Sequence, residues 1–175
     1  IPVREAIHQL ESEQLIDYEP NIGAIVKGIN DSVYMETLQV LALLEGFATA
    51  LSAHEIDQSG IERLKEINNR MKEHLQNFEL DKIADVNKEF HFCIYEYCPN
   101  ELLINTIKEM WERLDLVRHS GFRFFPQRTP YSIQEHEKMI QLIEQHADSL
   151  EIENFARKHK LNTLEAFKER NMKEN

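Results

Sequence analysis

Glycine, proline, cysteine and basic residues are all scarce in this chain of 175 residues. Only five glycines and five prolines are present, and most of them fall between segments whose apolar residues recur at helical spacing. Folds built from strands need many glycine- and proline-rich turns, so this composition predicts a mainly helical protein. No apolar run is long enough to span a bilayer, and we expect no membrane partner.

The charge balance and the thiols narrow the class further. The chain has 20 Lys and Arg against 31 Asp and Glu, a net charge of −11, which is unlike a protein whose whole surface binds nucleic acid. Any contact with DNA must therefore come from a small local module. The two cysteines, Cys93 and Cys98, match neither a disulfide framework nor a CxxC zinc pair. Two reduced thiols are typical of the cytoplasm, where we expect this protein to act.

The first 28 residues predict a helix followed by a hairpin. Pro2 suits the first turn of a helix, and apolar residues recur behind it at near-helical spacing. Two strand-like runs follow, LIDYEP and AIVKG, with turn residues from Asn21 to Gly23 between them. A helix that leads directly into such a hairpin is typical of the end of a winged helix-turn-helix. We therefore expect a partial DNA-binding domain over residues 1–28, a short linker, and a helical domain over residues 31–175.

Six amphipathic helices are predicted after the linker, so the expected fold is all-α, an antiparallel helical bundle. The first of them contains VLALLEGFATAL, which is apolar on most faces and belongs either at the centre of the bundle or in a homodimer interface. The stretch RHSGFRFF is expected to be a loop that either binds an anion or simply packs its phenylalanines. The expected helices span about Ser32–Glu55, Ser59–Phe78, Asp81–Tyr97, Glu101–His119, Tyr131–Gln145 and Ser149–Arg170.

Three of the eight histidines are predicted to face the interior of the bundle. His91 follows Asn87 by one helical turn, so both side chains share a face. His136 and His159 each lie on an apolar stripe of their own helix. Imidazoles that converge in a bundle core are natural ligands for zinc, nickel or manganese, with the asparagine oxygen and water completing the coordination.

Structural histidines are the alternative, because an inward histidine can also be a hydrogen-bonded core residue. His74 illustrates this, since it is predicted on an inner stripe with Ile67, Met71 and Phe78. Glu45, within LLEGFA, is the other polar residue in an apolar setting. A buried carboxylate needs a hydrogen-bonding or charged partner. We expect it to pair with an arginine such as Arg113 or Arg118, with a catalytic role as the alternative.

Several motifs together resemble the GntR family of bacterial transcription regulators. PVREAIHQLESEQLI and PNIGAIV are similar to that family's recognition helix and wing. LLEGFATALSA, NKEFHFCIYE, PNELL, EH and the late KHKL are similar to the helical FCD effector domain of its FadR subfamily. The resemblance runs from Ile1 to about Leu164. It implies that the sequence begins at the recognition helix, with the first two helices of the winged domain missing from it.

The resemblance also implies roles for individual residues. On the DNA side, Pro2 would set the start of the recognition helix and Arg4 would contact DNA in the major groove. The wing around Asn21 and Gly23 would approach the adjacent minor groove or backbone. The metal ligands of the family match Asn87, His91, His136 and His159. Asn87 stands where an Asp is commoner, which removes one negative charge and implies weaker metal affinity, or a larger part for water or a ligand carboxylate.

Family members often carry an arginine one turn before the LE pair that grips an acidic effector. Leu41 occupies that place here, so a carboxylate effector would need another anchor, for which Arg113, Arg118 and Arg123 are the candidates. The expected protein is thus a dimeric, ligand-responsive regulator of operator DNA that binds a divalent metal and a small, acidic metabolite.

Two functions from other classes stay open. One is a metal-dependent enzyme acting on a small molecule, although the sequence has no HExxH or nucleophile elbow, and Glu89 and Glu135 are the only evident general bases. The other is a helical interaction module with structural histidines.

Overall fold

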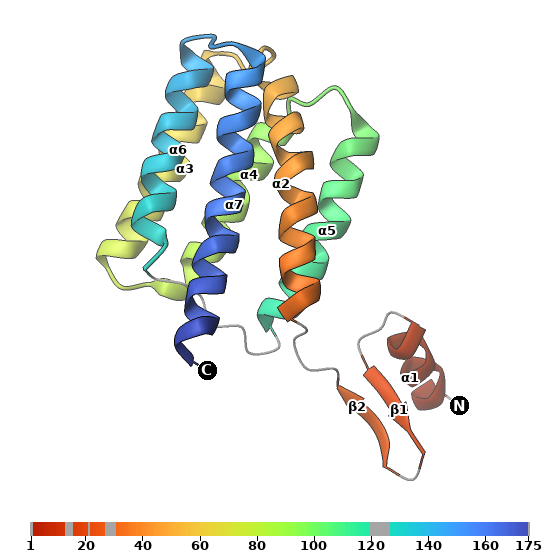
Figure 1. The fold of residues 1–175 in the computed structure, drawn as a ribbon. Helices are drawn as coiled ribbons and strands as arrows, with labels where there is room; N and C mark the ends of the chain where they lie inside the picture. The colour runs from red at the N-terminus through yellow and green to blue at the C-terminus, as the bar shows by residue number, and fades with distance from the viewer. Residues whose placement is uncertain (1, 13–15, 21, 27–30, 120–126, 175) are drawn as a thin grey trace.

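The computed structural model describes residues 2–12, 16–20, 22–26, 31–119 and 127–174, with only the backbone described at 26, 116–119, 171 and 173–174. These residues form seven helices and one hairpin, and α2 to α7 make up an antiparallel bundle (Figure 1). The predicted all-α bundle is therefore confirmed. The elements are α1 (Pro2–Ser12), β1 (Ile16–Glu19), β2 (Gly23–Val26), α2 (Asp31–Ala53), α3 (Gln58–Gln76), α4 (Leu80–Tyr95), α5 (Glu101–His119), α6 (Thr129–Glu144) and α7 (Ser149–Glu174).

The N-terminal segment forms the predicted helix and hairpin. Strands β1 and β2 pair antiparallel, with Glu19 opposite Gly23 at the turn. The Ile22 amide donates to the Glu19 carbonyl at 3.1 Å, and Gly23 adopts a φ of 105°, which only glycine adopts without strain. Most of the predicted linker lies outside the described residues, and α2 begins at Asp31.

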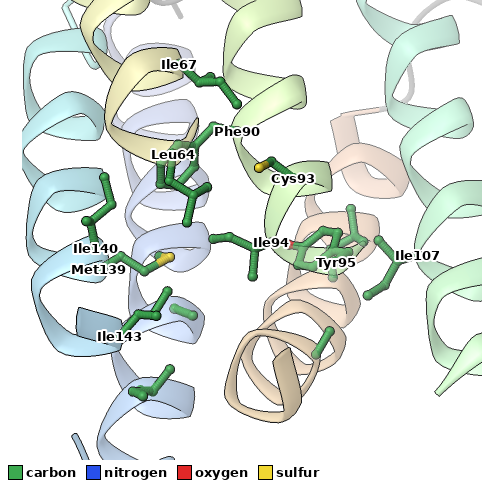
Figure 2. Close-up of a cluster of buried hydrophobic side chains, with 14 of the residues drawn as sticks. Leu64, Ile67, Phe90, Cys93, Ile94, Tyr95, Ile107, Met139, Ile140 and Ile143 are labelled. Carbon is green, nitrogen blue, oxygen red and sulfur yellow. The ribbon is translucent and has the colours of Figure 1, made fainter. Parts of the chain in front are cut away.

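Helix α2 packs against α7, α5 and α4 (Figure 1). Its inner face is buried, whereas Val40, Leu43 and Phe47 are exposed, so the predicted subunit interface stays a prediction. Helices α3, α4 and α6 form the rest of the core, and Figure 2 shows their side chains converging between them. Burying each of these large side chains stabilises the fold by about 1.5–3 kcal/mol. The core residues labelled there on these three helices are Leu64, Ile67, Phe90, Cys93, Ile94, Tyr95, Met139, Ile140 and Ile143.

The helices differ from the predicted ones mainly at their ends. Helix α3 stops at Gln76, and Phe78 then takes a left-handed φ of 59° that turns its ring into solvent, where it is 85% exposed. The prediction that Phe78 belongs to the inner stripe was therefore wrong. Ile67 and Met71 are buried as expected, whereas half-buried His74 turns to Glu79, with Nδ1 2.6 Å from a carboxylate oxygen. Among the described helices, none is both long and apolar enough to cross a bilayer.

Gly46 allows helices α2 and α7 to approach closely. A Cβ at this position would lie 2.9 Å from the Glu153 carbonyl oxygen and 3.1 Å from the Arg157 Cβ. The first of these atoms belongs to the backbone of α7, so it cannot move aside as the end of a side chain could. The close packing of α2 on α7 therefore depends on glycine, which has no side chain, at position 46.

Gly46→Ala is expected to lower the free energy of unfolding by about 1–3 kcal/mol, the usual cost of overpacking. In an open helix the same change stabilises by up to about 1 kcal/mol, because alanine has the better helix propensity. The sign of the change in the free energy of unfolding, measured by urea denaturation, therefore distinguishes overpacking from the gain in helix propensity. A more stable Gly46→Ala protein would contradict the close approach of α2 and α7.

Candidate metal centre

Three buried histidines from three helices meet in the bundle core. His91 comes from α4, His136 from α6 and His159 from α7, and one ring nitrogen of each lies within 4.8 Å of the others. Their ring centroids are 5.0–5.2 Å apart. The Nε2 atoms of His91 and His159 are separated by 3.3 Å. The inward stripes predicted from the sequence therefore converge on one point.

Each histidine is turned inward by the apolar neighbours on its own helix. Around His136 the buried positions of α6 include Ile133, Ile140 and Ile143, as the helical spacing predicted. The rings are also held by aromatic packing, since Phe90 stacks on His136 with centroids 3.8 Å apart and Trp111 packs against His91. These contacts limit the rotation of the imidazoles before anything binds.

Asn68 of α3 orients the His136 ring. The amide of Asn68 donates from Nδ2 to the Ile133 carbonyl at 3.1 Å, which leaves its Oδ1 facing the His136 Nδ1 at 3.1 Å. An amide oxygen accepts only, so the proton of neutral His136 lies on Nδ1 and the lone pair on Nε2. Asn68 follows Leu64 by one helical turn on the buried stripe of α3, a signal that could have identified it from the sequence.

Glu135 of α6 orients the His159 ring in the same way. Its Oε2 lies 2.6 Å from His159 Nδ1, and its Oε1 accepts a hydrogen bond of 2.7 Å from the Asn162 amide. Arg128 also donates to Oε2 through Nη2. A carboxylate on Nδ1 holds the proton there and makes Nε2 the better ligand, the arrangement commonly found behind metal-bound histidines.

Burial disfavours the charged forms of His136 and His159. It lowers the pKa of His136 well below its ordinary value, helped by the positive charges of Arg128 and Lys160. Burial also lowers the pKa of His159, although the hydrogen bond that its Nδ1 donates to Glu135 works against it. Burial alone would raise the pKa of Glu135, but His159 and Arg128 outweigh it, and the pKa is lowered overall. Neutral imidazoles beside an ionised carboxylate are the protonation states that metal binding needs.

The residues present fit a metal ion. Nε2 of His136 is buried and, among the described residues, has no hydrogen-bond partner, which is costly unless something occupies the space it faces. Two nitrogens bound tetrahedrally to one zinc ion, each about 2.0–2.1 Å from it, lie about 3.4 Å apart. The separation of 3.3 Å between the His91 and His159 Nε2 atoms agrees with this value.

Asn87 lies on α4, one turn before His91, and its side chain is half-buried. The one-turn spacing puts it on the same face of α4 as His91, and its role as a fourth protein ligand stays a prediction. Glu89, the other general base considered from the sequence, instead pairs with Arg70 on the outside of the bundle.

A second buried polar group lies beside the histidines, formed by Glu45, Lys160 and Trp111. Lys160 Nζ lies 2.9 Å from one carboxylate oxygen of Glu45, and Trp111 Nε1 donates to the other at 2.6 Å. The same ammonium lies 4.3 Å from the centre of the Trp111 ring. The prediction that Glu45 pairs with Arg113 or Arg118 was therefore wrong. Its partner is Lys160, the residue that follows His159 on α7.

Of the three arginines predicted to bind the effector, the structure describes the side chain of Arg113 alone. Arg113 is exposed on α5, two residues after Trp111 and therefore on the side of that helix turned away from the histidines. The Arg118 side chain and Arg123 lie outside the described residues. Leu41, at the place of the family's usual arginine, is fully buried in the apolar core. Arg128 is connected to His159 indirectly, because both contact the same oxygen of Glu135. No sequence pattern had identified Arg128 as a site residue.

The predicted DNA-binding residues lie on the N-terminal helix and hairpin. Pro2 begins α1, and Arg4 is exposed on the same helix. Gly23 begins β2 after the turn, and Asn21 lies outside the described residues. No described residue of α1 is fully buried, although Ile7 is half-buried and the helix packs against β1.

The geometry above agrees with the comparison to known families. A profile of the FCD domain matches residues 36–160, which include all three histidines. This chain therefore belongs to the FCD domain family, and the resemblance to the FadR subfamily of GntR regulators is confirmed.

Two curated relatives are regulators. The Uxu operon regulator of Haemophilus influenzae is 31% identical over 121 residues, which cover 63% of this chain and 45% of that protein. The HTH-type transcriptional regulator McbR of Escherichia coli is 24% identical over 113 residues, covering 65% of this chain and 51% of that protein. This chain thus spans about half the length of the curated relatives it matches. These relatives are transcription regulators by name, not enzymes.

Solved structures with a similar fold include further regulators. E. coli McbR/YncC matches with a TM-score of 0.79 at 17% identity, over 95% of this chain and 83% of that chain. A GntR family regulator from Pseudomonas syringae pv. tomato matches with a TM-score of 0.57 at 24% identity, over 94% and 68%. At these identities the likeness concerns the fold.

Proposed function

We propose that this chain is the effector-binding part, with a portion of the DNA-binding part, of a ligand-responsive transcription regulator. Its membership of the FCD family and the names of its relatives support this class. The observation that carries the proposal is the buried Nε2 of His136, which lacks a hydrogen-bond partner beside two further imidazoles.

The proposed metal ligands are Asn87, His91, His136 and His159, and the ion is divalent: zinc, nickel or manganese. When bound, the ion supplies positive charge and open coordination positions that a carboxylate can occupy. The chain's own contribution is to hold the rings in place, through Asn68 on one histidine and Glu135 on another. A small acidic metabolite is therefore the proposed effector.

The DNA-binding role rests on the N-terminal segment. We assign residues 1–28 to a winged helix-turn-helix and residues 31–175 to the effector and dimerisation domain. Arg4 on the exposed α1 would enter the major groove, and the turn at Asn21 and Gly23 would approach the minor groove or backbone. Effector binding would favour one arrangement of the two DNA-binding domains of a cytoplasmic homodimer over the other, and thereby change operator affinity.

The outer face of α2 supports the homodimer. Val40, Leu43 and Phe47 recur at helical spacing and are 41%, 49% and 46% exposed. An exposed apolar stripe on a helix whose other face is buried is typical of an interface between subunits. A second copy presenting the same stripe would cover it by two-fold symmetry.

Replacing Leu43 and Phe47 by Asp is therefore expected to convert a dimer into a monomer, because it would bury charges in the interface. Sedimentation equilibrium of the wild type and of the Leu43→Asp, Phe47→Asp variant measures this. Leu102→Asp is the matched control, since Leu102 is 77% exposed on a different helix, α5. A variant that remains dimeric would contradict this interface.

Metal analysis tests the core of the proposal. Protein purified without a histidine tag and equilibrated with zinc is expected to hold about one equivalent, and a His91→Ala, His136→Ala variant none. His54→Ala is the control, since His54 is exposed and lies outside the cluster, with its Nε2 2.7 Å from the Ser149 hydroxyl. Absence of metal from the wild type after dialysis against zinc, nickel and manganese would make the histidines structural. Turnover of a small acid by the metal-loaded protein would favour the enzyme alternative instead.

A further inference from the structure

Arg128 is a buried cation with unused hydrogen-bonding capacity. Its side chain is only 10% exposed, just before α6. Nη2 donates to Glu135 and, at 3.4 Å, to the His159 carbonyl, whereas Nε and Nη1 are buried and have no hydrogen-bond partner within the described part of the chain. Leaving a buried donor unpaired costs about 1–3 kcal/mol, and more for a charged group. Such an arrangement indicates a place that an acceptor fills.

An anion is the acceptor that suits this place. A guanidinium prefers carboxylates and phosphates, whose oxygens match its planar donors. The neighbouring cation, Lys160, already has a carboxylate partner in Glu45. Arg128 has one in Glu135, but this engages only one of its three nitrogens. A divalent ion on three neutral histidines would add further positive charge nearby.

The same guanidinium is connected to the histidine cluster. It bonds the Glu135 oxygen that also faces His159 Nδ1, so Arg128, Glu135 and His159 form a continuous chain. A change in how Arg128 is bonded therefore alters the group that orients His159. Groups that act on one shared element influence each other reciprocally.

We propose that Arg128 binds the carboxylate of an acidic ligand through Nε and Nη1, and that it couples this anion to the metal site through Glu135 and His159. This inference rests on the proposed function, whose effector it provides with an anchor. Arg128 thus takes the role that the family's usual arginine cannot play here, since Leu41 stands in its place.

Acetate binding to the zinc-loaded chain tests the proposal, with acetamide as the uncharged probe of the same shape. Isothermal titration is expected to detect acetate but not acetamide on the wild type. Arg128→Gln is expected to weaken acetate binding at least tenfold, and Arg128→Lys to an intermediate degree. Arg63→Gln is the matched control, because it also breaks an arginine–carboxylate pair, with Glu96, but on the surface.

The coupling between the anion site and the metal site is measured separately, through the zinc dissociation constant. Acetate is expected to shift the zinc dissociation constant of the wild type several-fold and to leave that of Arg128→Gln unchanged. Thermal melts of each variant verify that it folds. Equal acetate affinity in the wild type and Arg128→Gln, with zinc bound to both, would overturn the inference while leaving the metal site intact.

Failure of the metal site gives a different result. If the wild type binds no zinc, the proposed function fails, and acetate is then titrated into the metal-free protein. Acetate binding that still requires Arg128 would support the anion site without the coupling. Acetate binding that is absent or independent of Arg128 would overturn both.

Discussion

Replacing Glu45 by alanine is expected to lower the free energy of unfolding by about 3–5 kcal/mol, the usual cost of breaking a buried ion pair. Glu45 and Lys160 have side chains that are only 2% and 6% exposed, and their charged atoms are 2.9 Å apart. Without the carboxylate, the Lys160 ammonium keeps its desolvation penalty and loses its main compensation. The Trp111 N–H loses its acceptor as well.

Two controls separate the buried charge from other effects of truncation. Glu144→Ala breaks the surface pair with Lys65, whose side chains are 42% and 38% exposed, and is expected to cost less than about 1 kcal/mol. Adding Lys160→Met to Glu45→Ala removes the stranded ammonium and is expected to recover much of the loss. Chemical denaturation of all four proteins measures this. A Glu45→Ala protein as stable as Glu144→Ala would show that water reaches this pair.

Zinc is expected to produce the second large effect, by stabilising the folded chain. At a free concentration about 1,000 times its dissociation constant, a ligand that binds only the folded state adds about 4 kcal/mol. The three histidines and their supporting residues come together only in the folded bundle, so the unfolded chain offers no comparable site. Urea denaturation with zinc and with a chelator measures the difference.

Variants of the cluster refine this prediction. His136→Ala is expected to remove the zinc effect, whereas Glu135→Gln is expected to weaken zinc binding about 10–100-fold, as is usual when a supporting group is changed. His146→Ala, at an exposed position beyond α6, is expected to retain the full effect. A zinc effect that persists in His136→Ala would indicate that the ion binds elsewhere.

The helices and the inward histidines were accessible from the sequence because both depend on local geometry. Apolar residues three and four positions apart must share a helical face, and that face must be buried. His136 and His159 lie on such faces, so their inward direction followed from spacing alone. His91 was predicted to face inward in the same way, and the resemblance to the FCD domain, which implies the same three histidines, was confirmed by the family match.

The partners of buried polar groups could not be predicted, because they depend on how helices distant in the sequence pack together. Spacing indicated that Glu45 is buried, but only the close packing of α2 against α7 at Gly46 brings Lys160 to it in place of an arginine. The turn of Phe78 into solvent likewise follows from where α3 ends, not from its periodicity.

The supporting groups of the candidate metal centre were decided by tertiary structure in the same way. Asn68 reaches His136 from a different helix, and Arg128 meets His159 only through Glu135. By itself, the amino-acid sequence determined the helical class, the family and the histidines that face inward. Only the packed bundle decided which groups hold those histidines in place and which buried nitrogens are left without a partner, since these are properties of distances between helices.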